Sequence, residues 1–82
     1  MRRFTTLWID SKTKLAMVFS EGNYNHTMFQ LEYELENIGV SIIDVKPTII
    51  NGVSLMEIKT SRGDSYYYDE EREYLLTDYY KK

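Results

Sequence analysis

The stretch IIDVKPTIINGVSLMEIKT, residues 42–60, decides the fold. At its centre stands Asn51-Gly52, a pair that favours a two-residue type I′ hairpin turn because both turn residues need positive φ. A two-residue turn fixes the register of the flanking strands, and this register can be checked against charge and hydrophobicity. It places apolar residues opposite apolar ones and acids opposite bases, in the pairs Ile50–Val53, Val45–Ile58, Lys46–Glu57 and Asp44–Lys59.

The same register divides the side chains of this hairpin between two faces. The face expected to join the core holds Ile43, Val45, Ile49, Met56 and Ile58. The charged face holds Asp44, Lys46, Glu57 and Lys59. A slip of one residue would exchange the two faces, so the register of this hairpin is strongly specified. We therefore predict that this hairpin is the scaffold of the protein. Pro47 has no N–H to donate, which favours an edge position for its strand.

Residues 3–20 predict an earlier hairpin, with strands over 3–9 and 14–19 and a polar turn at 10–13. That turn pairs Trp8 with Leu15 and Phe4 with Phe19 on an apolar face. The opposite face is also apolar, and strands that are apolar on both sides are usually covered on both sides. A second helix or a second copy of the chain could supply the cover, so we expect a homodimer face at Leu7, Ile9, Ala16 and Val18.

Residues 24–38 fit two periodicities, and the sequence leaves both open. Apolar residues alternate with Gln and Glu in part of this segment, as in a strand. Other apolar residues are spaced as one stripe of a helix. The helix is favoured by its Glu, Leu, Gln and Met content, by a capping box from Thr27 to Gln30, and by Gly39 just after its end. The helical stripe consists of Met28, Leu31, Leu35 and Ile38.

The C-terminal third predicts a further strand and a second helix. A turn at 61–64, with two or four loop residues, leads into a strand over 65–68 whose Tyr67 faces the core. Residues 69–82 have the charge order of a helix, because an Asp cap and Glu residues come first and two Lys residues come last. The element order is then β-β-α-β-β-β-α. We expect residues 1–82 to form a single α+β domain with a mainly antiparallel sheet of about five strands and two helices.

Catalytic chemistry has few residues to draw on in this chain. It contains no cysteine and one histidine, His26, so neither a Cys–His pair nor a His-rich metal site can form within one chain. No apolar run reaches the roughly 20 residues that span a membrane. We therefore expect a cytoplasmic protein that is not an enzyme and has no cofactor, no metal and no membrane attachment.

The strongest compositional signal is tyrosine, with 8 in 82 residues, and the formal net charge is −3. Tyrosines and acids gather in the C-terminal third. Tyrosine provides a large contact area at low entropic cost, and carboxylates can take the place of phosphates before a basic protein surface. We expect a protein-interaction module that binds a protein with a basic surface, for instance a nucleic-acid-binding protein. The expected contact residues are Tyr66, Tyr68, Asp69, Glu70, Glu71, Glu73 and Tyr74.

Three further expectations concern partners. In its size, acidity and lack of catalytic residues the chain resembles, in type only, small phage accessory proteins that inhibit host enzymes. The alternative function is single-stranded nucleic-acid binding by Tyr66 and Tyr68, which the scarcity of nearby Lys and Arg disfavours. On the first helix an aromatic pair beside acids predicts a second interface, formed by Phe29, Glu32, Tyr33 and Glu36.

Overall fold

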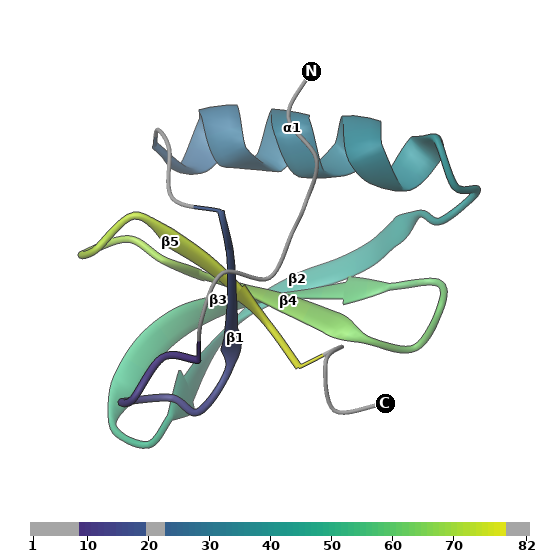
Figure 1. Cartoon of the computed structure of the whole chain (residues 1–82). Coiled ribbons are helices and arrows are strands. Elements are labelled where there is room, and N and C mark those ends of the chain that lie inside the picture. Colours follow the sequence, from purple (N-terminus) through teal and green to yellow (C-terminus); the bar gives the residue numbers. More distant parts are fainter. Residues whose placement is uncertain (1–8, 20–22, 79–82) are drawn as a thin grey trace.

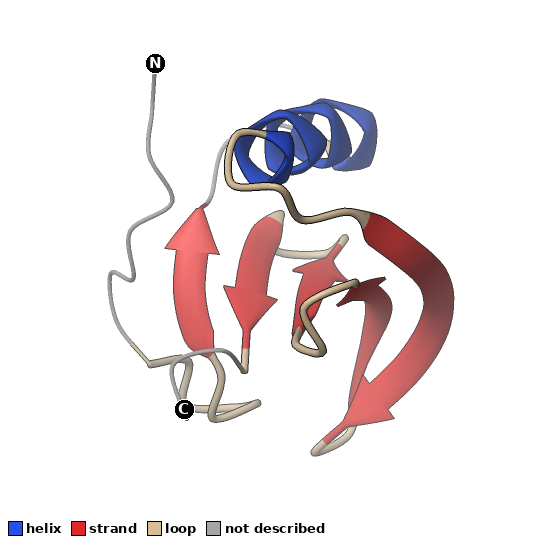
Figure 2. Ribbon diagram, turned by 90° about the vertical axis from the view of Figure 1, so that its right-hand side faces the viewer, coloured by secondary structure: helices blue, strands red, loops and turns tan. Residues whose placement is uncertain are grey.

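The computed structural model describes residues 9–19 and 23–78. Its elements are β1 (Ala16–Phe19), α1 (Tyr24–Glu36), β2 (Ile42–Ile50), β3 (Val53–Thr60), β4 (Ser65–Asp69) and β5 (Tyr74–Thr77). The strands form one antiparallel sheet in the order β1-β5-β4-β3-β2. Helix α1 lies across one side of this sheet (Figure 1), and the sheet is curved (Figure 2). The expected small α+β arrangement with a five-stranded antiparallel sheet is confirmed, but the described residues contain one helix instead of two.

The hairpin of β2 and β3 has the register that the sequence predicts. Asn51 and Gly52 adopt φ of 50° and 80°, as a type I′ turn requires. The cross-strand pairs are Ile50–Val53, Lys46–Glu57, Val45–Ile58 and Asp44–Lys59. Strand β2 lies at an edge of the sheet, which confirms the position expected from Pro47.

A β-bulge corrects one detail of this hairpin. The register shifts between Ile42 and Asp44, so the strand gains one residue relative to β3. Ile42, rather than Ile43, therefore packs against the core, and Ile43 is 65% exposed. Ile49 is also exposed, whereas Val45 and Ile58 pack in the core as expected.

The turn between β3 and β4 reverses the faces expected for the tyrosines. It is a three-residue loop, in which Thr60 N–H donates to Asp64 O and Gly63 N–H to Thr60 O, both at 3.1 Å. Gly63 has φ of 98°, a value that its lack of a Cβ permits. The odd loop length shifts the register by one residue from either expected loop, so Tyr66 pairs with Ile58. Tyr66 and Tyr68 therefore face α1, and Tyr67 faces the other side.

The second helix expected over 69–82 is wrong for the described residues. Tyr74–Thr77 is the strand β5, which pairs with β4 on one side and β1 on the other. Leu75 and Leu76 point to opposite faces and are fully buried. Hydrogen bonding to two neighbouring strands stabilises this segment more than a favourable charge order would stabilise a helix. The charge order alone is weak, because most of the stability of a helix comes from packing one apolar stripe. Residues 79–82, including the expected C-terminal Lys residues, lie outside the described part.

Helix α1 confirms the helical interpretation of residues 24–38, with a different cap at its start. The N-cap is Asn23, whose side chain accepts a hydrogen bond from His26 N–H, and Thr27 is buried instead of capping. At the other end Val40 N–H donates to Leu35 O at 2.9 Å and Gly39 N–H to Glu36 O at 3.1 Å. These are the two bonds of a Schellman motif with a left-handed glycine, as expected for Gly39.

The apolar face expected to form a homodimer is mostly inside the chain. Ile9 pairs with Ala16 and Asp10 N–H donates to Leu15 O at 2.8 Å, so the turn lies at 11–14, one residue later than expected. Ala16 is fully buried and Val18 packs beneath Leu31 and Leu35 of α1. The helix of the same chain therefore covers Val18, whereas Ile9 of this face is 47% exposed. Leu7 lies outside the described residues, as do Phe4 and Trp8 of the first expected strand.

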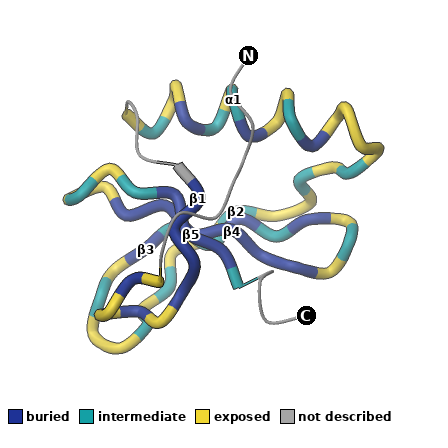
Figure 3. The backbone as a smooth tube through the Cα atoms, in the orientation of Figure 1, coloured by how far each residue is buried: buried dark blue, intermediate teal, exposed yellow. Residues whose placement is uncertain are grey.

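Two apolar clusters lie on the two faces of the sheet. Strands β4 and β5 are buried along almost their whole length (Figure 3). The cluster beneath α1 consists of Val18, Leu31, Leu35, Ile58, Tyr66, Tyr68 and Leu75. The cluster on the other face consists of Leu15, Met17, Leu55, Tyr67 and Leu76. Both faces of β4 and β5 are thus buried, whereas Ile43 and Ile49 of the edge strand β2 are exposed.

Candidate interaction surface

The C-terminal residues expected to contact a partner divide into a buried and an exposed group. Tyr66, Tyr68 and Asp69 are 6%, 1% and 2% exposed. The ring of Tyr68 meets that of Tyr24 edge to face, with 5.5 Å between their centroids. Burial raises the pKa of Tyr68, and the charges of Glu73 and Glu70 add to this effect. The exposed residues of the set are Glu70, Glu71 and Glu73. Tyr74 is half-buried.

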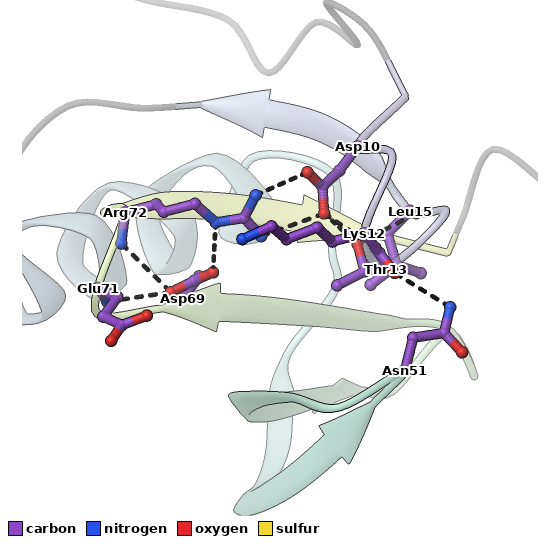
Figure 4. A network of polar contacts seen from close by, with 8 residues as sticks. All are labelled: Asp10, Lys12, Thr13, Leu15, Asn51, Asp69, Glu71 and Arg72. Carbon is purple, nitrogen blue, oxygen red and sulfur yellow. Dashed lines mark hydrogen bonds and ion pairs between the residues drawn. The ribbon is translucent and has the colours of Figure 1, made fainter.

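The buried charge of Asp69 is compensated by Arg72, in a polar network that also contains Asp10 (Figure 4). Arg72 Nε donates to Asp69 Oδ2 at 2.7 Å, and its two terminal nitrogens donate to the Asp10 carboxylate at 2.8 and 3.1 Å. Asp10 Oδ2 also accepts hydrogen bonds from Thr13 N–H and Thr13 Oγ1. The guanidinium lies 4.7 Å from the ring centroid of Tyr74. One arginine thus joins the turn before β1 to the turn between β4 and β5.

The electrostatics of this network are those of a structural ion pair. The hydrogen bonds from Arg72 lower the pKa of Asp10 to about 2, although burial alone would raise it. The pKa of Arg72 is raised by the hydrogen bond to Asp10. Asn51 Nδ2 donates to Lys12 O at 3.1 Å, which adds the β2–β3 turn to the same end of the molecule. Sequence reasoning missed this network, because Asp10 and Arg72 are 62 residues apart.

A second buried acid closes the β3–β4 turn. Asp64 is 3% exposed and accepts hydrogen bonds from Thr60 Oγ1 and from Arg62 Nε, the latter at 2.9 Å. Arg62 also donates to the Tyr66 hydroxyl at 3.2 Å. These contacts hold the turn that sets the register of β4, so Arg62 and Asp64 have a structural task.

The expected second interface forms a continuous surface groove between α1 and β2. Phe29 and Tyr33, one helical turn apart, are 66% and 45% exposed. Glu32 and Glu36 lie beside them on the same helix and are also exposed. The α1–β2 groove has a volume of about 320 Å³ and is lined by Phe29, Glu32, Tyr33, Leu35, Glu36, Val40, Ser41 and Ile42.

Apolar residues lie at the floor of this groove, but most of its accessible surface is polar, because acidic side chains form the rim. Leu35 is buried, and Val40 and Ile42 pack against the core beneath α1. Among the described residues that line the groove, none is Lys or Arg. Ile38 and Ile43, 61% and 65% exposed, follow at the helix end and at the start of β2. The helix periodicity predicted the aromatic and acidic rim, but the floor depends on the chain reversal at Gly39, which places Val40 and Ile42 beside the end of the helix.

Within residues 9–19 and 23–78, no group of three or more His, Asp or Glu side chains is placed to hold a metal ion. None of the helices in that part is long and apolar enough to cross a membrane. The sequence matches no protein-family model and no curated protein, and the structure matches no solved structure.

Proposed function

We propose that this protein is an interaction module that binds a basic segment of a partner protein through the α1–β2 groove. The observation that carries this proposal is the exposure of Phe29 and Tyr33 beside Glu32 and Glu36 over an apolar floor. Large aromatic side chains are rarely left exposed together without a use, and they are typical anchors of protein interfaces.

The charge of the groove supports a cationic partner. Carboxylates around an apolar floor favour Lys or Arg side chains, whose aliphatic stems can pack on Phe29 while their charges meet Glu32 or Glu36. Arg in particular can stack on an aromatic ring and bind a carboxylate at the same time. The rest of the acidic surface, including Glu70 and Glu71, adds long-range attraction that raises the association rate.

The C-terminal surface is a weaker candidate for the contact itself. Tyr66, Tyr68 and Asp69 are buried, which leaves three Glu residues and the edge of Tyr74 to meet a partner. The same burial removes Tyr66 and Tyr68 as stacking platforms for bases, so we do not propose nucleic-acid binding. Inhibition of a host protein by the bound module stays a prediction.

Two matched charge reversals test the proposal. Partners captured from lysate are identified and purified, and their affinities are measured for Glu32→Lys/Glu36→Lys and for Glu71→Lys/Glu73→Lys. Both variants change the net charge equally, so long-range steering changes equally in both. The groove variant is expected to lose at least about tenfold more affinity, because it reverses charges in the contact itself. Equal losses, or a greater loss in the control, would contradict the proposal.

A further inference from the structure

Strand β2 presents backbone groups that no described strand pairs with. It is the last strand of the sheet, and its ladder with β3 starts at the two-residue turn with the pair Ile50–Val53. The two residues that flank such a turn form a hydrogen-bonded pair, in which each N–H donates to the other residue's C=O. Hydrogen-bonded and non-hydrogen-bonded pairs then alternate along the two strands. Lys46 and Thr48 therefore bond to β3, whereas Val45, Pro47 and Ile49 turn their backbone groups outward. Pro47 contributes a carbonyl only.

An apolar cavity adjoins the far end of this edge. It has a volume of about 500 Å³, and we call it the β2–β3 cavity. Its lining is mostly apolar, with Glu70 as its charged member, and consists of Pro47, Thr48, Ile49, Ser54, Leu55, Met56, Tyr68 and Glu70. Pro47 lies opposite Met56, and both Met56 and Tyr68 belong with the core beneath α1. The cavity is therefore on the same side of the sheet as the α1–β2 groove.

The groove and the cavity are separated by the length of a short strand. Ile42 lines the groove and Ile49 lines the cavity, and the segment between them spans about 23 Å at roughly 3.3 Å per residue. A strand laid along β2 would turn every second side chain toward this side. Its backbone would meet the outward groups of Val45, Pro47 and Ile49, while its side chains would reach the groove at one end and the cavity at the other.

We propose that the partner binds as an extended segment of about eight residues that adds to β2 as a sixth strand. Its alternate side chains are apolar and enter the two hollows, and it carries Lys or Arg at the end beside Glu32 and Glu36. Main-chain hydrogen bonds with a sheet edge, combined with pockets for alternate side chains, are an established mode of peptide recognition. This inference rests on the proposed function and names the conformation and chemistry of the bound segment.

The charges favour such a segment over a second copy of this chain. The two hollows are lined by Glu32, Glu36 and Glu70, and by no Lys or Arg among the described residues. A second copy that paired through its own β2 would offer one cation, Lys46, which already lies opposite Glu57. On the other side of the edge, Asp44 and Lys46 are both exposed and nearly cancel in charge. The attraction for cations therefore lies on the side of the hollows.

The test compares two variants at one exposed position, Ile49→Pro and Ile49→Ala. Ile49 N–H points away from β3 and Pro47 already occupies the equivalent position two residues earlier, so the proline keeps the fold. Both variants lose the isoleucine side chain, but only Ile49→Pro removes the outward N–H. The probe is a displayed library of random peptides about ten residues long, selected on the wild-type protein and then labelled for fluorescence anisotropy.

We expect the selected peptides to alternate apolar residues and to carry Lys or Arg at one end. Ile49→Pro is expected to weaken their binding about tenfold relative to Ile49→Ala, because one peptide carbonyl loses its donor. Circular dichroism of both variants verifies that the sheet is intact. Equal affinities of the two variants, selected peptides that bind as helices, or a library without enrichment would overturn the inference.

The outcomes also separate this inference from the proposed function. If Glu32→Lys/Glu36→Lys abolishes partner binding while Ile49→Pro equals Ile49→Ala, the groove binds the partner and strand addition is wrong. If neither change has an effect, the proposed function fails as well. A concentration-dependent dimer that Ile49→Pro disrupts would assign the β2 edge to a second copy and contradict the inference.

Discussion

Replacing Arg72 by methionine should destabilise the protein strongly, because it leaves two buried carboxylates without their counter-ion. Asp10 and Asp69 are each 2% exposed, and both accept hydrogen bonds from the Arg72 guanidinium. The pKa of Asp10, lowered from 3.8 to about 2, corresponds to about 2.4 kcal/mol at roughly 1.36 kcal/mol per pKa unit. Adding Asp69, and allowing for the 24% exposure of the Arg72 side chain, gives about 3 kcal/mol.

The pH dependence provides the signature of this ion pair. Because the pKa of Asp10 is lower in the folded state than in the unfolded one, its contribution is complete above the unfolded value of 3.8. It is lost as the pH falls toward the folded value of about 2. The difference in free energy of unfolding between wild type and Arg72→Met should therefore shrink by about 2 kcal/mol from pH 6 to pH 2.

Urea denaturation followed by tryptophan fluorescence and circular dichroism measures this difference at several pH values. Lys46→Met is the matched control: it also removes one positive charge, but from an exposed position in β2, and should change stability by less than about 0.5 kcal/mol. A structural ion pair at Arg72 is contradicted if Arg72→Met is as stable as this control at neutral pH. It is also contradicted if the loss of unfolding free energy in Arg72→Met does not depend on pH.

Two further substitutions test the register of the sheet. Gly63→Ala should destabilise the protein by about 1 kcal/mol in thermal unfolding, because the φ of 98° is strained for a residue with a Cβ. A neutral Gly63→Ala would contradict the three-residue loop. Ile42→Ser should lower the free energy of unfolding by more than about 1 kcal/mol, and Ile43→Ser by less than about 0.5 kcal/mol, because the bulge turns Ile42 to the core and Ile43 to solvent. Chemical denaturation measures both values, and the reverse order would argue against the bulge.

Local signals in the sequence were sufficient for the β2–β3 hairpin and for α1. Asn51-Gly52 determines a turn type, and the turn type determines the register, so the cross-strand pairs from Ile50–Val53 to Asp44–Lys59 follow from two residues. The end of α1 similarly follows from Gly39, the residue whose left-handed φ allows the chain to reverse.

The errors arose where one residue more or less changes the face of a strand. The bulge at Ile43 and the three-residue loop at Ser61–Gly63 each add a residue that hydrophobic alternation does not reveal. As a result Tyr66 and Tyr68, expected on a binding surface, became part of the core. Residues 74–77 form a strand because they pair with β1 on one side and with β4 on the other. This pairing depends on distant parts of the chain, and the local charge order does not reveal it.

The candidate site was partly predictable for the same reason. Helical spacing alone places Phe29 and Tyr33 beside Glu32 and Glu36, and this rim was expected from the sequence. The floor of the groove and the β2–β3 cavity come from contacts between α1, β2 and β4, and no local pattern contains them.

The central claim is that the α1–β2 groove is the surface that meets the partner. The most direct measurement is a two-dimensional ¹⁵N–¹H NMR titration of the labelled protein with the purified partner or a selected peptide. We expect the largest shift changes on Phe29, Tyr33, Ile42 and their neighbours along the β2 edge. Changes concentrated instead at Glu71 and Glu73, with the groove unaffected, would contradict the proposal.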